Sequence, residues 1–116
     1  MRLLVALIAL EHAGFLWLEM FAWRAPVGLK VFHMTAEFAE STATLAANQG
    51  LYNGFLSAGL FWSLAASSPE VARPVQLFFL SCVLVAGVYG GATVGRNVFF
   101  IQGAPALLAL GLRLAR

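Results

Sequence analysis

The sequence predicts an all-α fold, an integral membrane four-helix bundle in which successive antiparallel helices run up, down, up and down. Hydrophobic residues make up 61% of the 116 residues and charged residues 10%, well below the ~25% charged residues of soluble domains. A soluble domain of this size could not bury so much apolar surface. Four apolar segments are long enough to cross a ~30 Å hydrocarbon layer as helices. Short connections between the later segments make their helices antiparallel neighbours.

The four predicted spans are residues 3–23, 42–66, 74–94 and 98–112 of one transmembrane domain. The first span has no small-x-small cleavage site, so we interpret it as a retained helix and not as a signal peptide. The second stops at the Ser67-Ser68-Pro69 sequence, and Pro74 is expected to open the third in a first-turn position. Gly95-Arg96-Asn97 is expected to form the tight turn into the fourth span.

Residues 24–41 form a polar connection between the first two spans. Within it Thr35 is placed to cap a short helix that lies on the membrane surface and ends at Glu40. Four Lys/Arg residues on the side of both termini against three on the other side predict cytoplasmic termini. The retained first helix fits insertion into a bacterial inner membrane.

Net charge and cysteine content argue against several classes of partner and site. The net charge is +2 and no basic run is present, which argues against nucleic acid as a partner. The single cysteine, Cys82, excludes an intrachain disulfide and a multi-cysteine metal site. We therefore expect no metal site. The expected surroundings are the lipid bilayer and a lipophilic small molecule.

Polar side chains interrupt the apolar spans, and each costs free energy in hydrocarbon unless it finds a partner. Counting residues from the helix ends places one or two polar residues of every span at a similar depth. A second group lies one step deeper. The sequence therefore predicts a polar pocket inside the bundle. The outer level holds Glu19, Asn48, Gln49, Tyr89 and Gln102, and the deeper level holds Glu11, His12 and Asn53.

Glu11, His12 and Glu19 are the predicted catalytic residues. A carboxylate in mid-membrane is costly and therefore tends to be functional, and two carboxyl groups with a histidine between them form a plausible acid–base set. Amides and tyrosines in the same pocket would orient a substrate, although such residues also serve only as hydrogen bonds between helices. The predicted substrate-binding residues are Asn48, Gln49, Tyr52, Asn53, Tyr89 and Gln102.

Small residues recur at helical spacing in two spans. Gly50, Gly54 and Ala58 form one row and Gly87 and Gly91 another, and such rows let helix backbones approach closely in lipid. On the second span this row faces away from Asn48 and Tyr52. Homo-oligomerisation through the glycine rows is one interpretation.

The run Ala46-Ala47-Asn48-Gln49-Gly50-Leu51-Tyr52-Asn53-Gly54-Phe55-Leu56 resembles the family catalogued as domain of unknown function 1304. The resemblance includes Glu11-His12 and Leu18-Glu19-Met20 before it. It continues in Ala86-Gly87-Val88-Tyr89-Gly90 and Gln102-Gly103-Ala104-Pro105-Ala106, so it covers essentially the whole chain. It implies a small four-helix integral membrane protein and no established activity.

These observations support three functional hypotheses. The leading hypothesis is a membrane enzyme that transforms a lipophilic small molecule by Glu/His acid–base chemistry, such as an isomerase or an epoxide-opening enzyme. No cofactor is assigned, although a haem-assisted variant would depend on His12 or His33. The alternatives are a small proton-coupled transporter of lipophilic compounds and a non-catalytic structural subunit of a membrane complex. The transporter hypothesis rests on architectural likeness alone.

Overall fold

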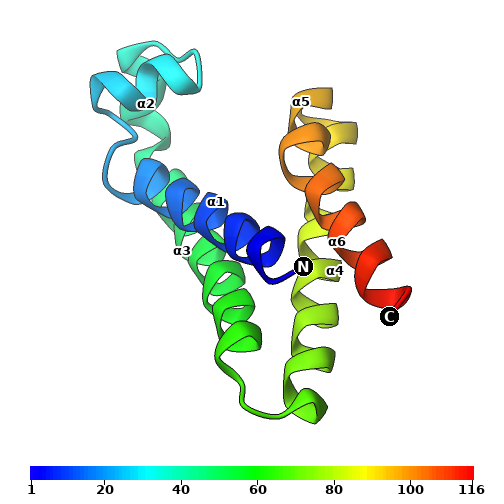
Figure 1. Ribbon diagram of the computed structural model, residues 1–116. Coiled ribbons are helices and arrows are strands. Elements are labelled where there is room, and N and C mark those ends of the chain that lie inside the picture. The colour runs from blue at the N-terminus through cyan, green and yellow to red at the C-terminus, as the bar shows by residue number, and fades with distance from the viewer. The chain divides into compact units, whose positions relative to one another are not determined.

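The computed structural model describes residues 1–116 and contains six α-helices, one π-helical segment and no strand (Figure 1). This confirms the all-α class. The chain forms two compact units. The central unit is Leu10–Ser57, and the terminal unit combines Met1–Ala9 with Ala58–Arg116. The single bundle of four helices that the sequence predicts is not confirmed.

Helix α1 (Arg2–Met20) ends three residues before the predicted boundary at Trp23. The Ala22 N–H donates to the Trp17 carbonyl at 3.1 Å, five residues earlier in the chain. This wider bond ends the regular helix. The following chain then folds into α2 (Pro26–Val31), a short helix that we did not predict. Pro26 favours its start because a proline in the first turn loses no helical hydrogen bond.

Gly28 explains why this turn is compact. A Cβ at Gly28 would overlap the Ala22 carbonyl oxygen and would lie 2.5 Å from the Trp23 carbonyl oxygen. These are main-chain atoms that cannot rotate away, so only glycine allows α2 to approach the end of α1 this closely. The Trp23 and Phe32 rings then pack with their centroids 4.8 Å apart.

Helix α3 (Ala36–Ala65) is one continuous helix of 30 residues. Thr35 caps it as predicted, because the Phe38 N–H donates to Thr35 Oγ1 at 3.1 Å. The prediction of a separate interfacial helix ending at Glu40 is wrong. No glycine or proline separates residues 36–41 from the next span, so the capped turn simply continues into it.

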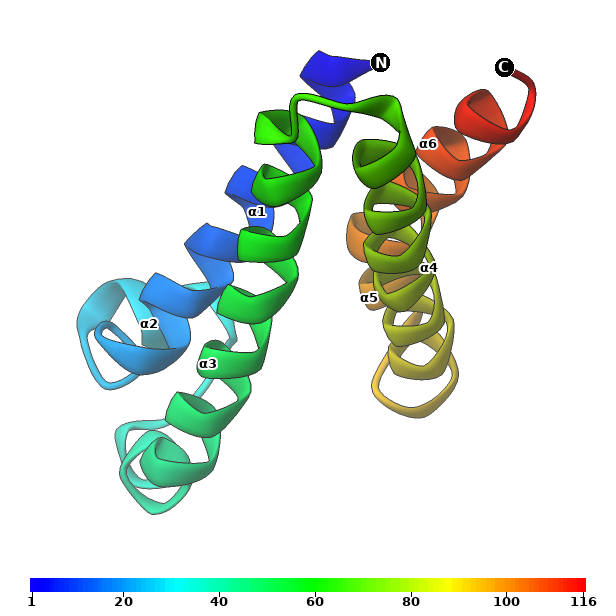
Figure 2. The same cartoon turned by 90° about the horizontal axis from the view of Figure 1, so that it is seen from below.

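In the central unit α1 and α3 pack as antiparallel neighbours, side by side in both views (Figures 1 and 2). The glycine row of α3 makes the contact: a Cβ at Gly50 would lie 2.7 Å from Met20 Cγ and 3.2 Å from the Leu16 carbonyl oxygen. A Cβ at Gly54 would lie 2.5 Å from Leu16 Cδ1. These two glycines therefore serve packing within the chain.

The terminal unit is built on α4 (Pro69–Thr93), against which α5 (Arg96–Val98), the π-helical segment η1 (Phe99–Gly103) and α6 (Ala104–Leu114) fold back. Pro69, and not Pro74, opens α4 with Ser68 before it. Pro74 lies within the helix, where the N–H it lacks would have bonded the carbonyl of Glu70 in the first turn. The turn into α5 lies at Val94 and Gly95, slightly earlier than predicted.

The second glycine row also packs within the chain. A Cβ at Gly87 would overlap the backbone of Gly103, and one at Gly91 would lie 2.7 Å from Phe99 Cβ. Both glycine rows therefore contact neighbouring helices of the same chain, and homo-oligomerisation through them stays a prediction. The π-helical turns come directly before Pro105, whose ring lacks the N–H that a regular α-helix would use there.

Three segments are long and apolar enough to cross a membrane: Arg2–Met20, Pro69–Thr93 and Arg96–Leu114. Helix α3 has the length but is not among them. The amides of Asn48, Gln49 and Asn53 make its middle more polar than a typical span.

Candidate functional site

The clearest polar contact between α1 and α3 joins Glu19 to Asn53. The Asn53 side-chain amide donates a hydrogen bond of 2.5 Å from Nδ2 to Glu19 Oε1. Glu19 lies in the last turn of α1 and Asn53 lies near the middle of α3. The absence of side chains at Gly50 and Gly54 brings the two helices close enough for this contact. Both polar residues are half-buried.

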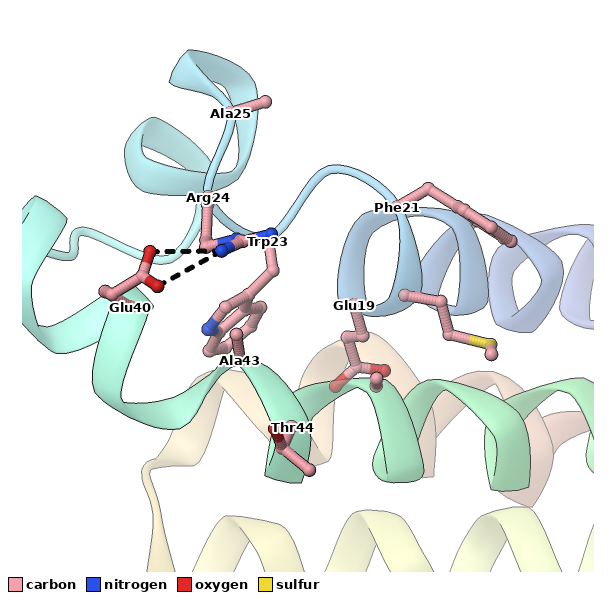
Figure 3. Close-up of a pocket in the computed structure, with 10 residues that line it drawn as sticks. Glu19, Phe21, Trp23, Arg24, Ala25, Glu40, Ala43 and Thr44 are labelled. Atoms are coloured by element: carbon pink, nitrogen blue, oxygen red, sulfur yellow. Dashed lines mark hydrogen bonds and ion pairs between the residues drawn. The ribbon is translucent and has the colours of Figure 1, made fainter.

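Glu19 borders an open hollow of about 670 Å³ in the central unit. Figure 3 shows its side chain extending from α1 towards α3, with the Arg24–Glu40 pair at the other end of the hollow. The lining combines charged groups with small methyl-bearing side chains and rings. Its residues are Glu19, Met20, Phe21, Trp23, Arg24, Ala25, Glu40, Ala43, Thr44 and Ala47.

A second hollow of about 200 Å³ also includes Glu19 and Trp23 in its lining. Most of its other residues are apolar, and it has no charged group besides Glu19. Glu19 and Trp23 therefore stand where a polar hollow adjoins a mainly apolar one. The remaining lining residues are Phe38, Thr42, Leu45, Ala46 and Gln49.

Two contacts hold the segment after α1 against the start of α3. The Trp23 indole Nε1 donates to Thr42 Oγ1 at 3.0 Å, and the Thr42 hydroxyl donates to the Phe38 carbonyl at 2.7 Å. Arg24 Nη1 donates to both carboxylate oxygens of Glu40, at 3.2 and 3.1 Å. The Arg24–Glu40 pair is solvent-exposed, so its contribution to stability is small.

Glu11 and His12 lie elsewhere on α1. His12 is fully buried and packs edge-on against Phe15, with ring centroids 5.4 Å apart. Glu11 Oε1 lies 3.9 Å from His12 Nδ1, and 29% of the Glu11 side chain is exposed. Eight residues separate Glu11 from Glu19, about 12 Å along the helix axis at 1.5 Å per residue. The two carboxyl groups therefore lie at different levels of α1, and Glu11 lines neither of the two hollows that Glu19 borders.

The predicted depth register is off by about one helical turn. Asn53, which was expected at the level of Glu11 and His12, instead meets Glu19. Asn48, which was expected at the level of Glu19, is exposed and lines neither hollow. The cause is that the two helix ends are not level, although the prediction assumed that they are: Glu19 lies one residue before the end of α1, whereas Asn53 lies 17 residues after the start of α3.

The other predicted substrate-binding residues are not gathered around Glu19 in the central unit, with one exception. Gln49 is exposed and lines the smaller hollow. Tyr52 is 56% exposed and packs edge-on against Phe55. Tyr89 and Gln102 belong to the terminal unit, Tyr89 exposed on α4 and Gln102 half-buried in η1.

The sequence reading missed four residues of the site: Trp23, Arg24, Glu40 and Thr42. Trp23 was interpreted as an interfacial anchor, and residues 24–41 were interpreted as a polar connection. One signal was available: Trp23 and Arg24 lie where the first predicted span ends, and Glu40 and Thr42 lie where the second begins. Residues at adjoining helix ends meet when the helices are antiparallel. No three His, Cys, Asp or Glu side chains are grouped to hold a metal ion.

Comparisons with known proteins give a family but no activity. A family model described as "Protein of unknown function (DUF1304)" matches residues 6–114. An "Uncharacterized protein YpaA" of Lactococcus lactis subsp. lactis (strain IL1403) is 37% identical over 110 residues, which cover 93% of this chain and 91% of that protein. No solved structure matches.

Proposed function

This chain belongs to the DUF1304 family of proteins of unknown function, and from the site around Glu19 we propose that it is an integral membrane protein that binds an amphipathic, mainly lipophilic small molecule and transforms it by proton transfer. Three apolar helices support the membrane placement. Large exposed side chains on them, such as Leu7, Phe78 and Val85, would be unfavourable in water but suit contact with acyl chains.

The observation that carries the proposal is the position of Glu19 where the two hollows adjoin, held there by Asn53. A ligand with a polar group and an apolar body fits this arrangement. Its polar group would lie in the larger hollow near Glu19, and part of its body would lie against Phe38 and Leu45 in the smaller one. Pockets of this kind, apolar with a few convergent polar groups, are typical of small-molecule sites.

Proton transfer is the chemistry that these residues can perform. Asn53 bonds Glu19 Oε1, which leaves Oε2 without a hydrogen bond to the protein. Protonated Glu19 would donate to the oxygen of a lipophilic epoxide as the ring C–O bond breaks. The same carboxylate would then remove a proton from the carbon next to the developing cation, giving an allylic alcohol of unchanged composition. We assign this step to Glu19 and leave the distant Glu11–His12 pair outside it.

The test uses purified protein in phosphatidylcholine liposomes with a long-chain epoxide and a terpene epoxide as probes. Mass spectrometry separates isomerisation, in which the product keeps the substrate's mass, from hydrolysis, in which it gains water. We expect Glu19→Gln to abolish turnover. The matched control is Glu37→Gln, because Glu37 is an exposed glutamate at the start of α3 that lines neither hollow. Full turnover by Glu19→Gln would contradict the assignment.

Proton-coupled transport is the second candidate, and the rings around Glu19 favour it. Trp23 and Phe21 line the larger hollow together with this carboxyl group, and aromatic faces beside an acid suit a lipophilic cation. The same liposomes, given a pH gradient and tetraphenylphosphonium, would show uptake that Glu19→Gln removes. If neither epoxide nor cation is handled while Glu19→Gln lowers only the melting temperature, the Glu19–Asn53 contact is structural.

A further inference from the structure

One end of the terminal unit gathers arginines from helices that are far apart in sequence. Arg2 Nη2 donates to the Leu64 carbonyl at 3.1 Å, which places the start of α1 beside the end of α3. Arg73 Nη1 donates to the Arg113 carbonyl at 3.2 Å, which places the start of α4 beside the end of α6. Only a three-residue connection, 66–68, separates α3 from α4, so all these helix ends lie at the same end of the unit.

This end is strongly cationic. With Arg116 it holds four of the chain's seven Lys/Arg residues, and one acid, the exposed Glu70 in the first turn of α4, lies at the same end. The ion pairs of the structure, His12–Glu11 and Arg24–Glu40, involve none of these arginines. The backbone caps use one of the five N–H donors of each of Arg2 and Arg73. The guanidinium groups therefore keep most of their donors for another acceptor.

Arg113 shows where an acceptor is missing. Its Nε is buried and has no hydrogen-bond partner, its side chain is half-buried, and its main-chain carbonyl accepts from the Arg73 guanidinium. A buried donor without an acceptor is costly, and a partly buried charge without a counter-ion is more so. The oxygens of a phosphate group match the guanidinium fork and would supply both an acceptor and a counter-charge.

We propose that this end of the terminal unit, at Arg2, Arg73 and Arg113, binds the phosphate of an anionic phospholipid. The inference rests on the membrane placement in the proposed function. Helices α4 and 96–114 are long and apolar enough to span, so their ends lie at the depth of lipid headgroups. Exposed leucines on α6, Leu108 and Leu112, continue from the site along the helix as a surface for an acyl chain. A soluble phosphate would gain nothing from that surface.

The experiment measures retained lipid by native mass spectrometry of the full chain in dodecyl maltoside with equal phosphatidylglycerol and phosphatidylcholine. We expect phosphatidylglycerol to be retained preferentially and Arg113→Gln to lower its excess about fivefold. Arg96→Gln is the matched control, an exposed arginine of the same unit at the start of α5. Arg113→Lys keeps the charge without the fork, so we expect an intermediate loss. If Arg113→Gln does not fold, the loss of phosphatidylglycerol in Arg113→Lys tests the proposal in its place.

Equal retention of the two lipids, or an equal loss in Arg96→Gln and Arg113→Gln, would overturn the inference. Displacement of phosphatidylglycerol by excess inorganic phosphate would also overturn it, because the site would then bind free phosphate. Flotation with phosphatidylcholine liposomes separates this failure from that of the proposed function. Protein that does not float contradicts the membrane placement, whereas protein that floats without preferring phosphatidylglycerol contradicts only the lipid site.

Discussion

Asn53 and Glu19, 34 residues apart, are joined by a 2.5 Å hydrogen bond from an amide on α3 to a carboxyl group on α1. Because the two groups come from different helices, the bond both orients the half-buried carboxyl group and links α1 to α3. The neighbouring glycines set the distance between the helices, and the hydrogen bond sets their register.

Asn53→Leu is expected to destabilise the central unit by about 1 kcal/mol, the upper part of the range for polar contacts between membrane helices. The substitution keeps the side-chain size but leaves Glu19 Oε1 without its donor. Thermal unfolding in detergent, followed by circular dichroism, measures the effect. Asn48→Leu is the control, because Asn48 is exposed on the same helix. An equal loss in both variants would contradict the importance of the Asn53 contact.

The all-α class, and a polar contact between an acid of the first helix and an amide of α3, could be anticipated from the sequence. Apolar composition determines the first, and the cost of leaving a carboxyl or an amide group unpaired in hydrocarbon determines the second. Which amide meets which acid could not be anticipated. That depends on how far α3 extends past the end of α1: the chain turns back after Met20, and α3 begins at Ala36, 17 residues before Asn53.

The turn itself depends on a contact that no local pattern reveals. In the sequence Gly28 has the pattern of an ordinary loop glycine. In the structure, its lack of a side chain lets α2 approach the carbonyls of Ala22 and Trp23. The Arg24–Glu40 pair also could not be predicted from a local pattern. Charged residues in a polar connection are usually solvated singly, and only the folded turn brings these two together. Tertiary contacts of this kind override the local sequence signal.

Gly50→Ala is expected to destabilise the protein by about 1–3 kcal/mol through overpacking. The added methyl would lie 2.7 Å from Met20 Cγ and 3.0 Å from Glu19 Cβ, so it would push apart the helices that carry the site. Gly14→Ala is the matched control, because a Cβ there meets nothing within 4 Å and alanine favours the helix. Chemical unfolding of the two variants should give opposite signs, and a destabilised Gly14→Ala with unchanged Gly50→Ala would contradict the packing.

Gly28→Ala is expected to open the turn between α1 and α3. Its methyl would meet main-chain oxygens, which cannot rotate away as a flexible side chain could. The Trp23 indole would then lose its hydrogen bond to Thr42 and its packing against Phe32. Fluorescence reports this in a background in which the other two tryptophans, Trp17 and Trp62, are replaced by phenylalanine. The emission should shift to longer wavelength in Gly28→Ala, whereas the control Gly111→Ala, which has open space, should leave it unchanged.

Arg24 and Glu40 allow stability and ligand binding to be separated. Their pair is exposed, so Arg24→Ala and Glu40→Ala should each change the free energy of unfolding by less than about 1 kcal/mol. Both side chains nevertheless line the larger hollow, where they border the space proposed for the ligand's polar group. We therefore expect either substitution to raise KM for a converted epoxide while kcat changes little, since Glu19 stays in place.

A double-mutant cycle completes the test of this pair. If Arg24 and Glu40 act on the ligand as one paired unit, the double variant should raise KM no more than either single variant does. Added salt should also reduce the difference from the unsubstituted protein, because exposed charges are screened. A fall in kcat with unchanged KM would instead mean that the pair positions Glu19. The role proposed for the larger hollow, binding the polar end of the ligand, would then be wrong.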